Sequence, residues 1–375
     1  MRYQLILLLS SLLIHSLNCS FQAILFNKMN KEKIGENLII SPLSIFQALS
    51  LATNGAKEET QSEMLDLLQS DTVEDLNEIN YKIITLFKEF TTIDIANAVM
   101  TKFNPLEDFS NIAQKYLAPV EPLKSVEQVN NWCSNKTHGK IDKILDELDP
   151  NTLMIILNAV YFKGEWASKF ESYATKKLTF YNLGKEEAEI DTMTQIAHFR
   201  YYEDKKVQAI ELRFMEDFMS AIVILPAEGI DINKYIDTLS FSNEEYSKII
   251  EGLSYVKVHL QLPKFELRFK EILNDVLSNL GMYNAFDPIN ADFKGLREEG
   301  NLFISKVIHK TYLKVFEDGC EAAAVTVIDI VGNGIPMEEK IYDMKVNRPF
   351  LFLLKNSKLP AGYDLVFMSK IEQLE

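Results

Sequence analysis

Cysteine is scarce in this sequence. Three cysteines occur in 375 residues, too few for the disulfide framework that stabilises small secreted domains. We expect Cys19 to leave with an N-terminal targeting segment or to become the new N-terminus, and Cys133 and Cys320 to be free thiols. The fold must then be stabilised by its core, and 47% of the residues are hydrophobic, enough for a large one.

Glycine and proline are also few, at 14 and 11 residues. No run of Gly, Ser or Pro interrupts the chain as a flexible linker would. Although the length alone would suggest two or three domains, the absence of a linker predicts one large compact unit.

Positive charge is in deficit. Lysine and arginine number 39 against 54 aspartates and glutamates, which gives a net charge of −15. Such a surface repels phosphate backbones, and residues 71–90 form an amphipathic helical pattern whose exposed positions are largely acidic. We therefore expect no nucleic-acid partner and no heparin-type site.

The only long apolar run lies at the N-terminus. Arg2 precedes "LILLLSSLLIHSL", which is too short to span a bilayer comfortably and is followed by small or polar residues before Phe21. This pattern is typical of a secretory signal peptide, which we predict over residues 1–20. Since no second long apolar segment follows, we expect a secreted, extracellular protein without a membrane partner.

Motifs of catalysis are missing. The sequence has no GxSxG, HExxH, GxxxxGK[ST], GxGxxG or paired CxxC, so we predict that it is not an enzyme. The histidines lack the spacing of metal ligands, and we expect no metal site and no cofactor. They are His15, His138, His198, His259 and His309. Of these, His309 would need a hydrogen-bond partner if its predicted strand is buried.

Apolar periodicity predicts helices in the first third of the chain and strands after about residue 150. "SPLSIFQALSLATNGA" begins with a Ser-Pro helix start, and Thr60 with Glu63 suggests a capping box for the next helix. "TLMIILNAVYFKG" is apolar on both faces, as a central strand is. Because helices and strands do not alternate regularly, we predict the α+β class.

The segment 317–336, "EDGCEAAAVTVIDIVGNGIP", has no settled local preference. Alanine favours helix, whereas the β-branched residues that follow favour strand. As a strand it has one small-to-apolar face, formed by Cys320, Ala322, Ala324, Thr326 and Ile328. The other face carries Glu321 and Asp329. The segment could be buried as a strand or could remain a loop.

Many motifs, in order, resemble the serpin family over residues 21–372. "NLIISPLSIFQALSLATNGAKEETQSEML" begins at residue 37, "VNNWCSNKTHGKI" at 129 and "LNAVYFKGEWASKF" at 157. "LPKF", "LGM", "ADFKGL", "SKVIHK" and "NRPFLFLL" follow from 262, 280, 291, 305 and 347. The resemblance implies mixed sheets surrounded by helices, with an exposed reactive loop at about 317–343, in a single metastable domain over 21–375.

By this resemblance the protein is a suicide inhibitor of a serine or cysteine protease. The protease cleaves the loop, an acyl-enzyme forms, and the loop inserts as a new strand into the main sheet. The partner is the target protease, held in a covalent complex, and the inhibitor is a monomer. The hinge residues are Glu317, Gly319, Cys320, Glu321, Ala322, Ala323 and Ala324, with Cys320 at the first inserting position.

The resemblance also assigns residues that gate insertion. Ser41, Pro42, Ser44, Asn158 and His309 match the shutter under the sheet opening, and Trp166 matches the breach where insertion starts. Buried polar side chains cost roughly 1–3 kcal/mol unless paired, so we expect the shutter residues to bond one another.

The scissile bond depends on how the loop is counted. Counting forward from Glu317 gives Asn333-Gly334, whereas counting back from Pro349 gives Met337 or Glu338, and Lys340 would suit a trypsin-like protease. The hinge count is preferred because hinge length must match the depth of the sheet. The alternative class of function is a non-inhibitory serpin acting as a carrier, chaperone or storage protein. The sequon at Asn135 predicts glycosylation.

Overall fold

The computed structural model describes residues 20–87, 93–239, 244–320 and 339–375. The described helices are α2 (Phe21–Glu32), α3 (Pro42–Thr53), α4 (Glu58–Leu68), α5 (Val73–Phe87), α6 (Glu107–Lys115), α7 (Val126–Lys136), α8 (Ile232–Leu239), α9 (Glu244–Gly252) and α10 (Asn274–Asn279), with 3-10 turns η1 (Ser172–Ala174) and η2 (Asn284–Phe286). The predicted signal peptide lies outside the described residues, apart from Ser20, whose hydroxyl caps α2.

The main sheet is mixed. Its strand order is β11 (Phe265–Ile272), β12 (Lys306–Val315), β4 (Met154–Phe162), β2 (Ile93–Thr101) and β3 (Val120–Pro122). β12 runs parallel to β4, while β11–β12 and β4–β2 are antiparallel. Every residue of β4 is buried, which confirms the prediction of a central strand in "TLMIILNAVYF".

A second sheet forms the other half of the molecule. Its order is β1 (Leu38–Ile40), β16 (Leu365–Ile371), β15 (Phe350–Asn356), β9 (Met219–Pro226), β8 (Val207–Arg213), β7 (Glu186–Glu203), β10 (Ser254–Pro263) and β14 (Tyr342–Lys345), with β6 (Lys176–Asn182) paired to β7. A short pair, β5 (Gly164–Glu165) with β13 (Gly319–Cys320), lies where β12 ends. The α+β prediction is confirmed.

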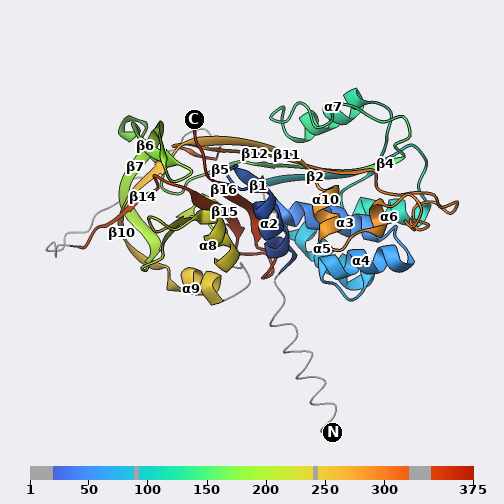
Figure 1. The fold of residues 1–375 in the computed structure, drawn as a ribbon, viewed down its shortest axis with the longest axis horizontal. Helices are drawn as coiled ribbons and strands as arrows, with labels where there is room; N and C mark the ends of the chain where they lie inside the picture. Colours follow the sequence, from blue (N-terminus) through green and yellow to red (C-terminus); the bar gives the residue numbers. More distant parts are fainter. Residues whose placement is uncertain (1–19, 88–92, 240–243, 321–338) are drawn as a thin grey trace, which may run out of the picture.

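Helix α3 lies at the centre of the fold. All of its residues are buried, and it contacts β2 and β4 of the main sheet and β16 of the second sheet. Ser41 caps its first turn, and Pro42 occupies a first-turn position where the missing N–H costs nothing. Figure 1 shows α7 on one side of the main sheet and α3, α4, α5 and α6 on the other. The main sheet is therefore covered on both faces.

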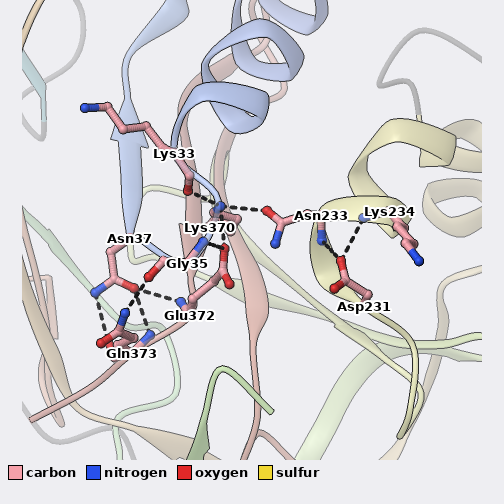
Figure 2. Close-up of polar contacts among 9 residues, drawn as sticks. All are labelled: Lys33, Gly35, Asn37, Asp231, Asn233, Lys234, Lys370, Glu372 and Gln373. Atoms are coloured by element: carbon pink, nitrogen blue, oxygen red, sulfur yellow. Dashed lines mark hydrogen bonds and ion pairs between the residues drawn. The ribbon is translucent and has the colours of Figure 1, made fainter. Parts of the chain in front are cut away.

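A buried lysine joins three distant segments (Figure 2). Lys370 Nζ donates to the Lys33 carbonyl at 2.8 Å and to Asn233 Oδ1 at 2.7 Å, and it forms an ion pair with Glu372 at 2.5 Å. Glu372 also accepts the Gly35 amide. Burial lowers the pKa of Lys370, and the ion pair with Glu372 offsets part of this decrease. Since two of these bonds reach Lys33 and Asn233, the cluster fixes the turn after α2 and helix α8 against β16.

Two local predictions from the first third are wrong. Strands β1 and β2 lie within the region expected to be helical. Helix α4 begins at Glu58 with Lys57 at the N-cap, so Thr60 is not a cap. Its hydroxyl instead accepts the Asp292 amide at 3.0 Å, and Glu63 accepts the Asn284 amide at 2.7 Å. These two side chains therefore form hydrogen bonds with distant loops and not with the first turn of their own helix.

Candidate functional site

The residues predicted to form the shutter come together at the middle of the main sheet. His309 Nδ1 donates to Asn158 Oδ1 at 2.5 Å, and the Ser44 hydroxyl donates to the same oxygen at 2.8 Å. The Ser41 amide donates to His309 Nε2 at 3.2 Å. These four residues are all buried, and they bond one another as the burial argument predicts. Pro42 contributes through its place in α3 and makes no side-chain hydrogen bond.

These contacts define the charge state of His309. Because Nε2 accepts an amide proton and Nδ1 donates to an amide oxygen, the ring is neutral with its proton on Nδ1. Burial lowers the pKa of His309 to about 3. Among the described residues no acidic group pairs with the ring to stabilise a charged form, so the shutter is a neutral network at physiological pH.

The shutter spans the boundary between two strands. β12 pairs directly with β4, from Lys306 opposite Ile155 to Tyr312 opposite Tyr161. His309 lies directly opposite Asn158 in this register. A new strand entering between β4 and β12 must therefore separate this pair and break the hydrogen bond between their side chains. The sheet is closed at this boundary.

At the breach, Trp166 is packed beneath the end of β12. Its indole N–H donates to the Phe316 carbonyl at 3.0 Å, and its ring stacks on Phe214 at 4.4 Å between centroids. Its main-chain amide donates to the Asp318 carbonyl at 2.9 Å. Because one residue contacts the chain both before and after Glu317, Trp166 fixes the path by which β12 leaves the sheet.

Glu317 is anchored at the start of the hinge. Its carboxylate lies 3.0 Å from Lys264 Nζ and accepts the Thr175 hydroxyl at 2.7 Å. Burial disfavours its charge, but the Thr175, main-chain and Lys264 contacts outweigh burial and lower the pKa of Glu317. Its main-chain carbonyl also accepts the Phe170 amide. The contacts keep Glu317 ionised and fixed to the body of the protein.

Gly319 and Cys320 form strand β13 and are also buried. A Cβ on Gly319 would lie 2.1 Å from the Gly164 carbonyl oxygen, and its φ of +148° suits glycine alone. The Cys320 thiol is fully buried, which raises its pKa well above the ordinary value. The expectation that the loop is exposed from residue 317 is therefore wrong for Glu317, Gly319 and Cys320. Pairing with β5 draws Gly319 and Cys320 into the body, and Glu317 is held there by its side-chain contacts.

The other predicted loop residues divide into two groups. Lys340 is described, and its ammonium lies over the Tyr342 ring at 3.9 Å from the centroid. Next to it, Glu339 accepts a hydrogen bond from His198 at 2.8 Å. The remaining predicted positions lie outside the described residues: Glu321, Ala322, Ala323, Ala324, Asn333, Gly334, Met337 and Glu338.

Three further residues complete the site, and none was assigned a role from the sequence. Asn97 on β2 accepts from Asn158 Nδ2, which extends the shutter to a third strand. Lys264 and Thr175 hold Glu317. Lys264 lies within the "LPKF" motif, a signal that could have identified it, but no sequence pattern marks Thr175. The two cysteines of the described residues, Cys133 and Cys320, are free thiols, as predicted, and both are buried.

The neutral His309 predicts a loss of stability in acid. Below pH 6.5, the ordinary value, an unfolded histidine binds a proton that the native ring cannot bind until about pH 3. The native state therefore loses up to about 1.4 kcal/mol per pH unit between those limits. We expect His309→Gln to be less stable at pH 7 but to lose less stability on acidification, as measured by urea unfolding at pH 7 and pH 5.

His259→Gln is the matched control, since this ring is partly exposed and lies beside Asp343 at 2.9 Å. This variant should lose as much stability on acidification as the unmodified chain does. An equally steep loss in His309→Gln would show that the buried ring is not held neutral.

Comparison with known proteins agrees with the geometry. The family model Serpin (serine protease inhibitor) matches residues 16–373. The chain is 32% identical to the leukocyte elastase inhibitor of Xenopus laevis, over 89% of this chain and 93% of that protein. It is 31% identical to Iripin-2 of Ixodes ricinus, over 90% and 88%.

Solved structures give the same result. The thermophilic serpin tengpin, in its native state, matches with a TM-score of 0.84 and 33% identity over 95% of this chain and 93% of that one. Native protease nexin-1 has the same fold, with a TM-score of 0.84 at 24% identity over 95% of this chain and 97% of that one. With its ordered motifs, closed main sheet and these similarities, the chain belongs to the serpin family of serine protease inhibitors.

Proposed function

We propose that this serpin is a secreted suicide inhibitor of a serine protease or a cysteine protease. The observation that carries the proposal is the arrangement at β12. This strand pairs directly with β4 and continues at its far end into the hinge. A cleaved loop attached to β12 would enter the sheet between β12 and its parallel neighbour β4, across the shutter.

Inhibition then proceeds by competition between two steps. The nucleophile of the protease attacks the loop carbonyl and forms an acyl-enzyme, and the amine end of the cleaved bond leaves. Water can hydrolyse this ester, or the thioester of a cysteine protease, and release an active protease. Insertion of the loop beside β12 instead carries the tethered protease to the far end of the sheet before hydrolysis. The serpin supplies the cleavable loop and the free energy of insertion.

The packing of Cys320 supports the assignment of the inserting face. Its side chain already lies within a hydrophobic cluster with Trp166 and Phe214. In a strand, residues two apart share a face, so continuation of β13 would bury Ala322 and Ala324 and leave Glu321 and Ala323 outward. We propose Asn333-Gly334 as the scissile bond, with Met337 and Lys340 as the alternatives.

Two adjacent substitutions test this mechanism. Ala324→Arg places a charge on the inserting face, where burial costs several kcal/mol, and about 1.4 kcal/mol already slows a step tenfold. Insertion should slow enough for hydrolysis to win, so Ala324→Arg should be cleaved without trapping the protease. Ala323→Arg places the same charge on the outward face and should still trap it.

The measurement is the yield of complex that resists boiling in detergent. A panel of serine and cysteine proteases is first screened with the unmodified chain, and the protease that is trapped is used for both variants. Equal trapping by the two variants, or equal failure, would refute the alternation of faces. Cleavage without any trapped protease across the panel would favour a non-inhibitory serpin.

We further propose that the chain is secreted through the signal pattern at residues 1–20 and carries a glycan on Asn135. Within the described residues, no helix is long and apolar enough to cross a membrane. Asn135 is exposed on the last turn of α7. Thr137 of the same sequon is buried, and its hydroxyl donates to the Cys133 carbonyl at 2.8 Å. Transfer of the glycan therefore has to precede folding of this turn.

Expression in a secreting eukaryotic host tests the secretion and glycosylation proposal. The protein should appear in the medium, and glycosidase treatment should lower its mass. Asn135→Gln should remove this mass shift while leaving the amount secreted similar. A protein retained in the cells would contradict secretion, and a secreted protein with no shift would contradict use of the sequon.

A further inference from the structure

A cavity of about 840 Å³ opens beside the hinge. One side is formed by β7, β8 and β10, and the other by residues 166–172 together with Asp318. Its volume lies within the range of small-molecule sites, roughly 300–1,000 Å³. The shutter does not use this cavity, and the described contacts of the hinge leave it open.

Large apolar side chains line the cavity but remain exposed. Ile196 and Met215 are each 56% exposed, and Tyr255 is 73% exposed. Tyr255 also stacks on His198, with 5.5 Å between ring centroids. Apolar side chains gathered at one cavity can be covered by an apolar or aromatic ligand, which would remove their surface from water.

The cavity also carries a free positive charge. Arg200 is paired with Glu211 at 2.7 Å, and Lys169 with Glu165 at 3.0 Å. The guanidinium of Arg213, by contrast, makes no ion pair or hydrogen bond with any described residue. An exposed, unpaired arginine beside apolar side chains is suited to bind a planar anionic group through two parallel hydrogen bonds.

We propose that this cavity binds a small organic anion with an aromatic body and a carboxylate group. The aromatic body would cover Ile196, Met215 and Tyr255, and the anionic group would pair with Arg213. The anionic class follows from Arg213, because the other lining lysines and arginine already have carboxylate partners, namely Lys169, Lys257 and Arg200. A neutral ligand would gain from the apolar contacts alone.

Such a ligand would lie against the hinge. Trp166 and Asp318 line the cavity, and the Trp166 amide donates to the Asp318 carbonyl at 2.9 Å. The chain has two tryptophans, so a Trp132→Phe variant leaves Trp166 as the only one. Its fluorescence therefore reports on the hinge side of the cavity when a ligand binds. Binding requires neither protease nor cleavage, so the site is independent of inhibition.

The test is calorimetric titration of the intact, uncleaved chain with 2-naphthoate, whose neutral analogue 2-naphthamide serves as the matched ligand control. We expect saturable binding of 2-naphthoate, and binding of the amide that is weaker by about tenfold or more, because the amide loses the charge-assisted hydrogen bonds to Arg213. Arg213→Gln should weaken the binding of 2-naphthoate by a similar factor and leave the affinity for 2-naphthamide unchanged. Met215→Glu should weaken the binding of both ligands.

Arg297→Gln is the control variant, since Arg297 does not line the cavity and pairs with Glu299. It should bind 2-naphthoate as the unmodified chain does, and circular dichroism should show that every variant folds. Absence of saturable binding would overturn the proposal. So would equal binding of acid and amide, or full 2-naphthoate affinity in both Arg213→Gln and Met215→Glu, which would place the ligand elsewhere.

Discussion

The direct pairing of β12 with β4 is the constraint on which the rest of the structure depends. The two strands run parallel and side by side at the centre of the main sheet, and His309 faces Asn158 across their boundary. Their side chains are tied to α3 through Ser41 and Ser44. Separation of the strands must break a buried polar network, whose groups each cost free energy when left without a partner. A barrier to opening is thus built into the native state.

The opposite end of β12 is held by different contacts. Glu317 is bound by Lys264 and Thr175, and Gly319 approaches the Gly164 carbonyl so closely that no side chain fits. These contacts fix the first residues of the hinge in line with the boundary between β12 and β4. Under the proposed mechanism, the shutter would resist opening of the sheet and the anchored hinge would define where opening begins.

Much of the fold and of the candidate site could be predicted from the sequence, because several residues of the site lie within recognisable motifs. The motifs mark the polar residues of the central network and the tryptophan at the end of β12, and the unbroken apolar run of β4 predicts a central strand. The marked residues are Ser41, Ser44, Asn158, His309 and Trp166. The burial of Cys320 could not be predicted, since β13 and β5 are very short strands whose pairing depends on tertiary packing. The contact of Thr175 could not be predicted either, because its hydroxyl donates to Glu317, 142 residues away in the sequence. At Thr60, a valid local capping signal was overridden by a distant loop.

The central claim is that the closed sheet is metastable and gains a strand when the loop is cut. The most direct test is to compare the melting temperature of the intact chain with that of a chain cleaved once between residues 329 and 340. An inserted strand would add on the order of ten hydrogen bonds worth about 1 kcal/mol each, and each kcal/mol raises the melting temperature by about 1–2 °C in a chain of this size. We predict a rise on the order of 10 °C or more, whereas an unchanged or lower melting temperature after complete cleavage would contradict the account.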